Sequence, residues 1–153
     1  MLDAFERLGV DADYAAESTP AVWSPACYLR ALNPAHDIVA DGRKVSGNAQ
    51  YRRRESVVQH GSLTYSVRAD AHLGAFSGHG VTPAEFHDHV VGIDELAGVS
   101  RAEAVEAVEG SLAAWADASV GSWTDAELDR AREKVETKYA ADEWVRRHPD
   151  DRS

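Results

Sequence analysis

Residues 36–63 decide the fold of this chain, and they read HDIVADGRKVSGNAQYRRRESVVQHGSL. The apolar pair at 38–39 leads into Asp41-Gly42, a dipeptide that favours a tight hairpin turn, and Val45 follows on the returning side. Two more strand-like runs, SVV and SLTYSV, lie between residues 56 and 67, and we expect them to be broken at His60-Gly61. This stretch therefore predicts a small β-sheet built around one hairpin.

Helical patterns lie on either side of the predicted sheet. Apolar residues at helical spacing predict a short helix over residues 2–8, and residues 10–15 suit a short strand. Ser100 with Glu103, and Thr124 with Glu127, have the spacing of a helix capping box, so two longer helices are expected to begin there. We expect four large aromatic residues to anchor these helices in a core: Trp115, Trp123, Tyr139 and Trp144.

The order of these elements, a helix, strands and then two longer helices, predicts an α+β or mixed α/β domain. The 153 residues suit a single domain over 1–153, with a strand-rich ligand-site half at 1–67 and a helical half at 93–147.

Composition excludes several classes of protein. The formal net charge is −10, whereas proteins that bind nucleic acid or anionic lipid normally present a basic face. No apolar run approaches the roughly 20 residues of a membrane span, and the first residues lack the pattern of a signal peptide. Cys27 is the one cysteine, so neither an intrachain disulfide nor a cysteine-rich zinc site is possible. A cytoplasmic protein is expected.

The segment GRKVSGNAQ, residues 42–50, is the candidate ligand loop. Small residues after Lys44 let the backbone approach a ligand closely, and a lysine there can neutralise phosphate or a developing negative charge. The segment has neither the P-loop spacing nor the dinucleotide fingerprint. The residues alone therefore leave two interpretations open, a phosphate-binding loop or a tight turn with an exposed lysine.

The same stretch resembles the signature of the biotin/lipoate protein ligase family, which contains lipoate–protein ligases and octanoyltransferases. The family pattern has an Asn-Asp pair before G-[RK]-K-[IV]-S-G-[NS]-A, followed by Q-H-G-[ST]-[IL]; here these read HD, GRKVSGNA and QHGSL. KYAADEW, residues 138–144, also resembles the K-Y-x-x-x-E-W ending of these catalytic domains. The resemblance implies a partial catalytic domain of this family. It also implies an α/β fold, or α+β by a stricter count, with a mixed β-sheet and packed helices.

The resemblance assigns roles to individual residues. Lys44 matches the family's essential lysine, which contacts the acyl and phosphate groups of an acyl-adenylate, and Asp37 matches the acidic residue near nucleotide and magnesium. The loop beside the ligand is matched by Ser46, Gly47, Asn48 and Ala49, and the strand backing the pocket by Gln59, His60 and Gly61. For His60 we expect a buried, hydrogen-bonded structural role rather than that of a general base.

Three departures from the family pattern bear on function. His36 stands where the family usually has Asn. The upstream motif, an Arg-rich segment running into glycines, has no counterpart in residues 1–36, so the chain is expected to be the C-terminal part of a catalytic domain. Cys27 lies at about the distance from the signature at which the cysteine-dependent octanoyltransferases carry their nucleophile.

Three functions follow from the resemblance. The first is an ATP- and Mg²⁺-dependent lipoate–protein ligase, which forms lipoyl-AMP and transfers the acyl group to a lysine of a lipoyl domain. Such acceptors belong to 2-oxoacid dehydrogenase complexes or are the glycine cleavage H protein. The second is an octanoyltransferase that uses Cys27, and the third is a non-catalytic fragment or subunit that needs an N-terminal partner. The basic run Arg52–Arg54 is either a docking site for an acidic acceptor or a solvated strand edge.

Overall fold

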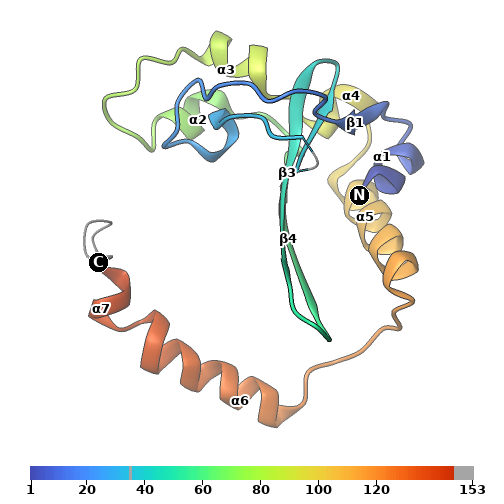
Figure 1. Ribbon diagram of the computed structural model, residues 1–153, viewed down its shortest axis with the longest axis vertical. Coiled ribbons are helices and arrows are strands. Elements are labelled where there is room, and N and C mark those ends of the chain that lie inside the picture. Colours follow the sequence, from blue (N-terminus) through green and yellow to red (C-terminus); the bar gives the residue numbers. More distant parts are fainter. Residues whose placement is uncertain (35, 147–153) are drawn as a thin grey trace. The chain divides into compact units, whose positions relative to one another are not determined.

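The computed structural model describes residues 1–34 and 36–146 (Figure 1). Its sheet contains four strands, β1 (Ala12–Tyr14), β2 (Asp37–Ala40), β3 (Arg43–Arg52) and β4 (Val57–Leu63). The α-helices are α1 (Leu2–Arg7), α2 (Ala69–Leu73), α3 (Pro83–His89), α4 (Ile93–Ala97), α5 (Arg101–Ala116), α6 (Asp125–Lys134) and α7 (Asp142–Val145). A 3-10 turn, η1 (Cys27–Leu29), precedes β2, and a π-helical turn, η2 (Val135–Tyr139), follows α6.

The predicted α/β class is confirmed, and the sheet has a simple topology. Its strands lie in the order β1-β2-β3-β4, and each neighbouring pair is antiparallel. The predicted turn joins β2 to β3, with φ angles of 51° at Asp41 and 71° at Gly42, as a two-residue hairpin requires. An isolated parallel bridge joins Lys44 to Val90, so the segment after α3 lies beside the start of β3.

A β-bulge distorts the hairpin beside the candidate lysine. Ile38 pairs with Ser46, but Val39 pairs with Lys44, which leaves Val45 as the extra residue on β3. A bulge re-aims the side chains around it because it interrupts the alternation of the strand. The bulge lies at the most buried part of β3, where Val45 and Ser46 are both almost inaccessible.

β4 is continuous, which contradicts the predicted break at His60-Gly61. The strand runs from Val57 to Leu63, and Gly61 pairs with Asn48 in register. A Cβ atom on Gly61 would lie 2.6 Å from the Asn48 side-chain oxygen, so a larger residue here would force the Asn48 side chain to shift. The glycine therefore marks a close approach between side chain and backbone, not the end of a strand.

Two clusters of buried apolar side chains hold the first 117 residues together. One cluster joins α1, the β2–β3 hairpin and α5, and its buried members are Phe5, Val10, Ile38, Ala40, Val45, Val91, Ile93 and Ala104. The other packs α2 and α3 against η1, and its buried members are Ala26, Leu29, Ala69, Leu73, Val81, Phe86 and Val90. Val90 and Val91 belong to different clusters, and the Val91 N–H donates to the Lys44 carbonyl. The backbone of Lys44 is thus fixed where the two clusters meet.

The chain divides into two compact units, residues 1–117 and 118–153, so the predicted helical half is shared between them. Residue 147, at the end of that half, lies outside the described residues. Both predicted capping boxes are present, at the start of α5 and of α6. In the described part of the chain, no helix is long and apolar enough to cross a membrane.

The predicted aromatic anchors are not in a core. The exposed fractions are 69% for Trp115, 76% for Trp123, 47% for Tyr139 and 46% for Trp144. Tyr139 and Trp144 pack edge to face against each other with ring centroids 5.2 Å apart, and the Lys138 ammonium lies 4.5 Å from the Trp144 ring centroid. The prediction was wrong because helical spacing shows which residues share a face but not whether another element covers that face.

Candidate functional site

Lys44 and Asp37 form a buried ion pair at the start of the β2–β3 hairpin. The Lys44 Nζ lies 2.7 Å from Asp37 Oδ1, and the two side chains are only 8% and 7% exposed. The other carboxylate oxygen of Asp37 accepts a hydrogen bond of 2.8 Å from the backbone N–H of Asn33. Because lysine is rarely buried without a partner, Asp37 explains why this cation is stable in the interior.

Gly47 makes room for this ion pair. A Cβ atom at position 47 would lie 3.2 Å from Asp37 Oδ1 and 3.2 Å from Lys44 Cε. Residues three apart in a regular strand point to opposite faces, so the bulge at Val45 is what brings the Lys44 side chain beside Gly47. The small residue and the bulge together set the position of the lysine.

A chain of hydrogen bonds supports the wall of the site next to Gly47. Ser46 Oγ donates to the Ser62 carbonyl at 2.9 Å, and Asn48 Nδ2 donates to Ser46 Oγ at 3.1 Å. The backbone N–H and the Nδ2 of Asn48 also donate to the His36 carbonyl, at 2.9 and 3.1 Å. These bonds tie the segment before β2 to both β3 and β4, so they are expected to keep the wall rigid.

Buried residues on either side of Cys27 fix the position of its backbone. It begins η1, and Ala26 and Leu29 on either side of it are buried in the α2–α3 cluster. The Leu29 carbonyl accepts hydrogen bonds from the N–H groups of Val22 and Trp23, which anchors the turn, while Cys27 itself is exposed. Burial, followed by the charge of the adjacent Cys27, raises the pKa of Tyr28.

Most of the predicted site residues line one open cleft of about 470 Å³. Seven of them line it: Cys27, Asp37, Lys44, Gly47, Asn48, Ala49 and His60. Ser46 and Gly61 do not line the cleft but support Asn48, as described above. Of its other lining residues, His36 was noted as a departure from the family pattern. Sequence reasoning did not single out Arg30, Asn33 or Ser62, because only the folded loop before β2 and the β3–β4 pairing bring them to the lysine.

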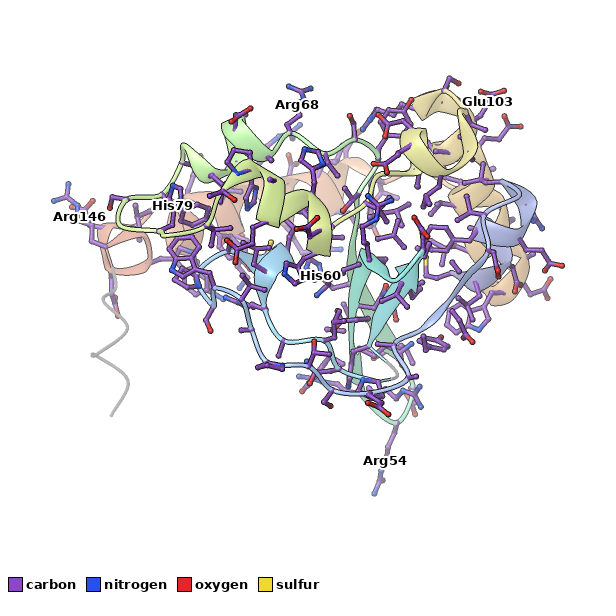
Figure 2. All side chains as sticks on the ribbon, turned by 90° about the horizontal axis from the view of Figure 1, so that it is seen from above. Arg54, His60, Arg68, His79, Glu103 and Arg146 are labelled. Carbon is purple, nitrogen blue, oxygen red and sulfur yellow. The ribbon has the colours of Figure 1, made fainter. Side chains whose placement is uncertain are left out.

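The prediction of a buried, hydrogen-bonded His60 is wrong. His60 is exposed on β4 and lines the cleft opposite Ala49, its partner across the two strands (Figure 2). Gln59 is also exposed and lies on the other face of the strand, where its amide is 3.5 Å from Asn48 Oδ1. The strand that carries these two residues is therefore one wall of the site.

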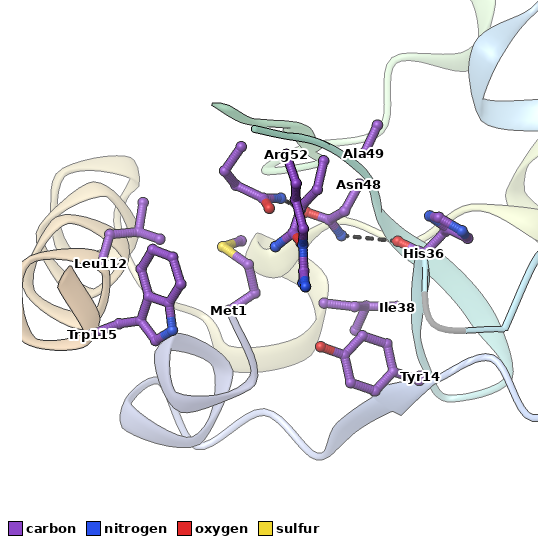
Figure 3. A pocket seen from close by; sticks show the side chains of 11 residues that line it. Met1, Tyr14, His36, Ile38, Asn48, Ala49, Arg52, Leu112 and Trp115 are labelled. Carbon is purple, nitrogen blue, oxygen red and sulfur yellow. Dashed lines mark hydrogen bonds between the residues drawn. The ribbon is translucent and has the colours of Figure 1, made fainter. Parts of the chain in front are cut away.

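A second cavity, of about 580 Å³, lies on the opposite face of β3 (Figure 3). Asn48, Gln50 and Arg52 form its polar side, and Met1, Leu112 and Trp115 form its apolar side. The two cavities share the wall made by His36, Asn48 and Ala49. No candidate residue for the transfer chemistry lies exclusively in this second cavity.

The basic run Arg52–Arg54 lies at the turn between β3 and β4. Arg52 donates two hydrogen bonds to Gln50 Oε1, and the Arg53 guanidinium lies 5.3 Å from the Tyr51 ring centroid. Arg54 points away from the rest of the molecule (Figure 2). Within the described residues none of the three forms a salt bridge, so their charge is available to a partner.

The family model described as "Lipoyl protein ligase A/B catalytic domain" matches residues 1–113, which include the whole cleft around Lys44 and every predicted site residue. The chain belongs to this family. The resemblance predicted from the Lys44 segment is thereby confirmed.

Octanoyltransferases are among the curated proteins that are similar to this chain. It is 30% identical over 165 residues to octanoyltransferase LipM of Brevibacillus brevis, and the match covers 94% of this chain and 57% of the relative. The LipM of Bacillus subtilis is 29% identical over 162 residues, with the same coverage. The chain therefore spans little more than half the length of these relatives.

Solved structures confirm the fold of the catalytic domain. Lipoate-protein ligase A bound with ATP superposes with a TM-score of 0.70 at 22% identity, over 93% of this chain and 53% of that one. A putative lipoate protein ligase from Thermoplasma acidophilum with bound lipoic acid gives 0.68 at 23% identity, over 93% and 53%. At these identities the likeness concerns the fold.

Proposed function

We propose that this protein transfers an octanoyl group to a lysine of an acceptor protein by way of a thioester on Cys27. The observation that carries the proposal is the position of Cys27 in the same cleft as Lys44. The octanoyltransferase relatives support it as well. The acceptors we propose are lipoyl domains of 2-oxoacid dehydrogenase complexes and the glycine cleavage H protein.

The first step exchanges one thioester for another. The Cys27 thiolate attacks the carbonyl carbon of an octanoyl thioester on a carrier, so that a new S–C bond forms at Cys27 and the carrier thiolate leaves and takes up a proton. In the second step the neutral amine of an acceptor lysine attacks the Cys27 thioester. A C–N bond forms, the Cys27 thiolate leaves, and the proton lost by the amine passes to solvent.

Lys44 has an electrostatic role in both steps. Each attack places negative charge on the carbonyl oxygen, and a cation fixed beforehand stabilises that charge without reorganisation. The ammonium has three N–H donors, and Asp37 engages one of them at 2.7 Å. We expect another donor to face the oxyanion, while Asp37 keeps the side chain in position.

The ATP-dependent lipoate ligase reaction is a second proposal. What favours it is the charge of the cleft, because Lys44 and Arg30 both line it and would suit the phosphate of an acyl-adenylate. Asp37 as a magnesium ligand stays a prediction, and both of its oxygens are already engaged, by Lys44 and by the Asn33 N–H. Among the described residues there is no group of three or more acidic, His or Cys side chains that would hold a metal ion.

An assay with two donors separates the two reactions. A lipoyl domain is incubated in one tube with an octanoyl-carrier thioester and in another with lipoate, ATP and Mg²⁺, and product is detected by intact mass. The transferase proposal predicts a mass gain only with the octanoyl donor and none in the Cys27→Ser variant. A gain only with lipoate and ATP, at an equal rate in Cys27→Ser, would move the assignment to the ligase.

A further inference from the structure

Arg30 carries the uncompensated charge of the cleft. The charged side chains that line the cleft are two cations, Arg30 and Lys44, and one anion, Asp37. Asp37 compensates Lys44, because the two side chains form an ion pair of 2.7 Å. Within the described residues Arg30 forms no salt bridge. The cleft is therefore locally positive in a chain whose net charge is −10, and Arg30 is the source of that charge.

A hydrogen bond holds this arginine beside the proposed nucleophile. Arg30 Nε donates to the Ser24 carbonyl at 3.0 Å. The bond uses one of the five N–H donors of the guanidinium and leaves the two terminal NH2 groups, which can bind two oxygens of one anion. Cys27 begins η1 and Arg30 is its C-cap, so their Cα atoms are at most about 11 Å apart. One turn therefore carries both the thiol and the cation.

The neighbouring wall of the cleft is polar. Asn33, Asn48 and Ser62 line it, and none of the lining residues is a large apolar side chain. Such a wall suits a ligand segment that contains amide groups and ends in an anion, because polar groups that leave water need hydrogen-bond partners. The cleft thus has the chemistry of a site for a polar arm that ends in a negative charge.

The donor in the proposed reaction contains an arm of this kind. Group carriers such as coenzyme A hold acyl groups as thioesters. Their thiol is the end of a pantetheine arm, which contains two amide bonds and has a phosphate at its other end. When the thioester carbon lies at Cys27, the arm can run along the polar wall. The phosphate is the first charged group of the donor that the cleft can meet.

We propose that Arg30 binds the phosphate of a phosphopantetheine thioester and so selects the acyl donor of Cys27. The two terminal NH2 groups donate to two phosphate oxygens, while the Ser24 carbonyl keeps the guanidinium in place. The inference rests on the proposed function, because the thioester donor is what brings the phosphate to the cleft. Arg30 acts only in the first step, since the carrier has left before the acceptor lysine attacks.

Three octanoyl thioesters separate the phosphate from the rest of the donor. They are octanoyl-pantetheine, which has no phosphate, octanoyl-phosphopantetheine, and octanoyl-coenzyme A, which adds a nucleotide. Acylation of Cys27 in the 153-residue chain is followed by intact mass. The variants compared with the unaltered chain are Arg30→Gln, Arg30→Lys and the control Arg68→Gln, which removes the charge of an exposed arginine that lines neither cavity.

We expect Arg30→Gln to raise the KM for both phosphate-bearing donors roughly tenfold and to leave kcat unchanged, because a charge-assisted contact to the donor is lost. Arg30→Lys should recover part of the loss, since it keeps the charge but not the two-pronged geometry. All four proteins should react equally with octanoyl-pantetheine. An equal loss with octanoyl-pantetheine, or no loss with octanoyl-phosphopantetheine, would overturn the assignment. A loss confined to coenzyme A would also overturn it, because Arg30 would then contact the nucleotide.

Binding without reaction separates this inference from the proposed function. S-methyl-phosphopantetheine and S-methyl-pantetheine have no acyl group to transfer, so calorimetry with the two probes measures the effect of the phosphate alone. We expect tighter binding of the phosphorylated probe, and we expect Arg30→Gln to abolish the difference. That result supports the phosphate contact even when no donor acylates Cys27, which would count against the proposed function only. Equal affinity of the unaltered chain for the two probes would overturn the phosphate contact.

Discussion

Lys44 Nζ and Asp37 Oδ1 lie 2.7 Å apart in a site where both side chains are more than nine-tenths buried. The pair explains how a lysine can remain buried in the β2–β3 hairpin, and it also positions that lysine at the wall of the cleft. An interior ion pair is costly to break, because the remaining partner keeps a buried charge without compensation. The pair therefore couples the stability of the fold to the chemistry of the site.

This coupling is measurable in a double-mutant cycle. Lys44→Met should lower the free energy of unfolding by about 3–5 kcal/mol, because Asp37 is left buried and charged. We expect Asp37→Asn to be destabilising as well, and the double variant to lose less than the sum of the two, with a coupling energy of about 1–3 kcal/mol. Urea unfolding of the four proteins gives these values, and strict additivity would contradict a direct interaction.

Gly47→Ala tests whether the lysine must be held in place. The new Cβ atom would lie 3.2 Å from both Asp37 Oδ1 and Lys44 Cε, so the ion pair must shift. We expect the rate of acyl transfer to fall at least tenfold, at a stability cost of about 1–3 kcal/mol. Gly80→Ala is the matched control, since nothing lies within 4 Å of its new Cβ atom. Similar rates for the two variants would show that the position of the lysine does not limit transfer.

The arginines at the tip of the ribbon are predicted to attract the acceptor. The chain carries a net charge of −10, which opposes the approach of an acidic acceptor domain, whereas the run Arg52–Arg54 is locally basic and would attract it. Replacing Arg53 and Arg54 by Glu should raise the KM for an acidic lipoyl domain roughly threefold to tenfold, leave kcat unchanged and flatten the salt dependence. Arg101→Glu, an exposed charge at the start of α5, serves as the control. An unchanged KM in the double variant would assign the run to a solvated strand end.

The contribution of the α5 capping box to stability is predicted to depend on pH. Hydrogen bonds from Ser100 to the Glu103 carboxylate lower the pKa of Glu103 below its ordinary value of 4.5. Because the folded-state pKa is depressed, the box contributes stability above pH 4.5, and that contribution is lost as the pH falls through the lowered pKa. An NMR titration of Glu103 should therefore have its midpoint below 4.5, and Ser100→Ala should move the midpoint upwards. An unshifted midpoint in the variant would contradict the capping role of Ser100.

Local signals in the sequence predicted those parts of the fold that depend on neighbouring residues. The turn at Asp41-Gly42 and the caps at Ser100 and Thr124 were correct because each requires only a few adjacent residues. The predicted break at Gly61 was wrong because this glycine lies within β4 and packs closely against the Asn48 side chain on the neighbouring strand. The predicted burial of Trp115 was also wrong, since helical spacing does not show whether another element covers that side chain.

The sequence likewise predicted only those features of the candidate site that depend on residues close together in the chain. The signature identified Lys44, Asp37 and Gly47, which lie close together in the chain, but it could not show the bulge that turns Lys44 towards Gly47. Arg30 and Ser62 carry no signal of their own, and only the loop before β2 and the β3–β4 pairing bring them to the cleft. Cys27 was noted for its distance from the signature, and the folded loop places it in the same cleft as the lysine.

The central claim is that Cys27 carries the acyl group, and one measurement addresses it directly. The chain is mixed with an octanoyl-carrier thioester in the absence of ATP and acceptor, quenched in acid and digested for peptide mass spectrometry. We predict one octanoyl group on the peptide that contains Cys27, sensitive to hydroxylamine and absent from Cys27→Ser. Octanoyl transfer to an acceptor at an undiminished rate by Cys27→Ser, with no acyl group on that peptide in the unaltered chain, would contradict the account.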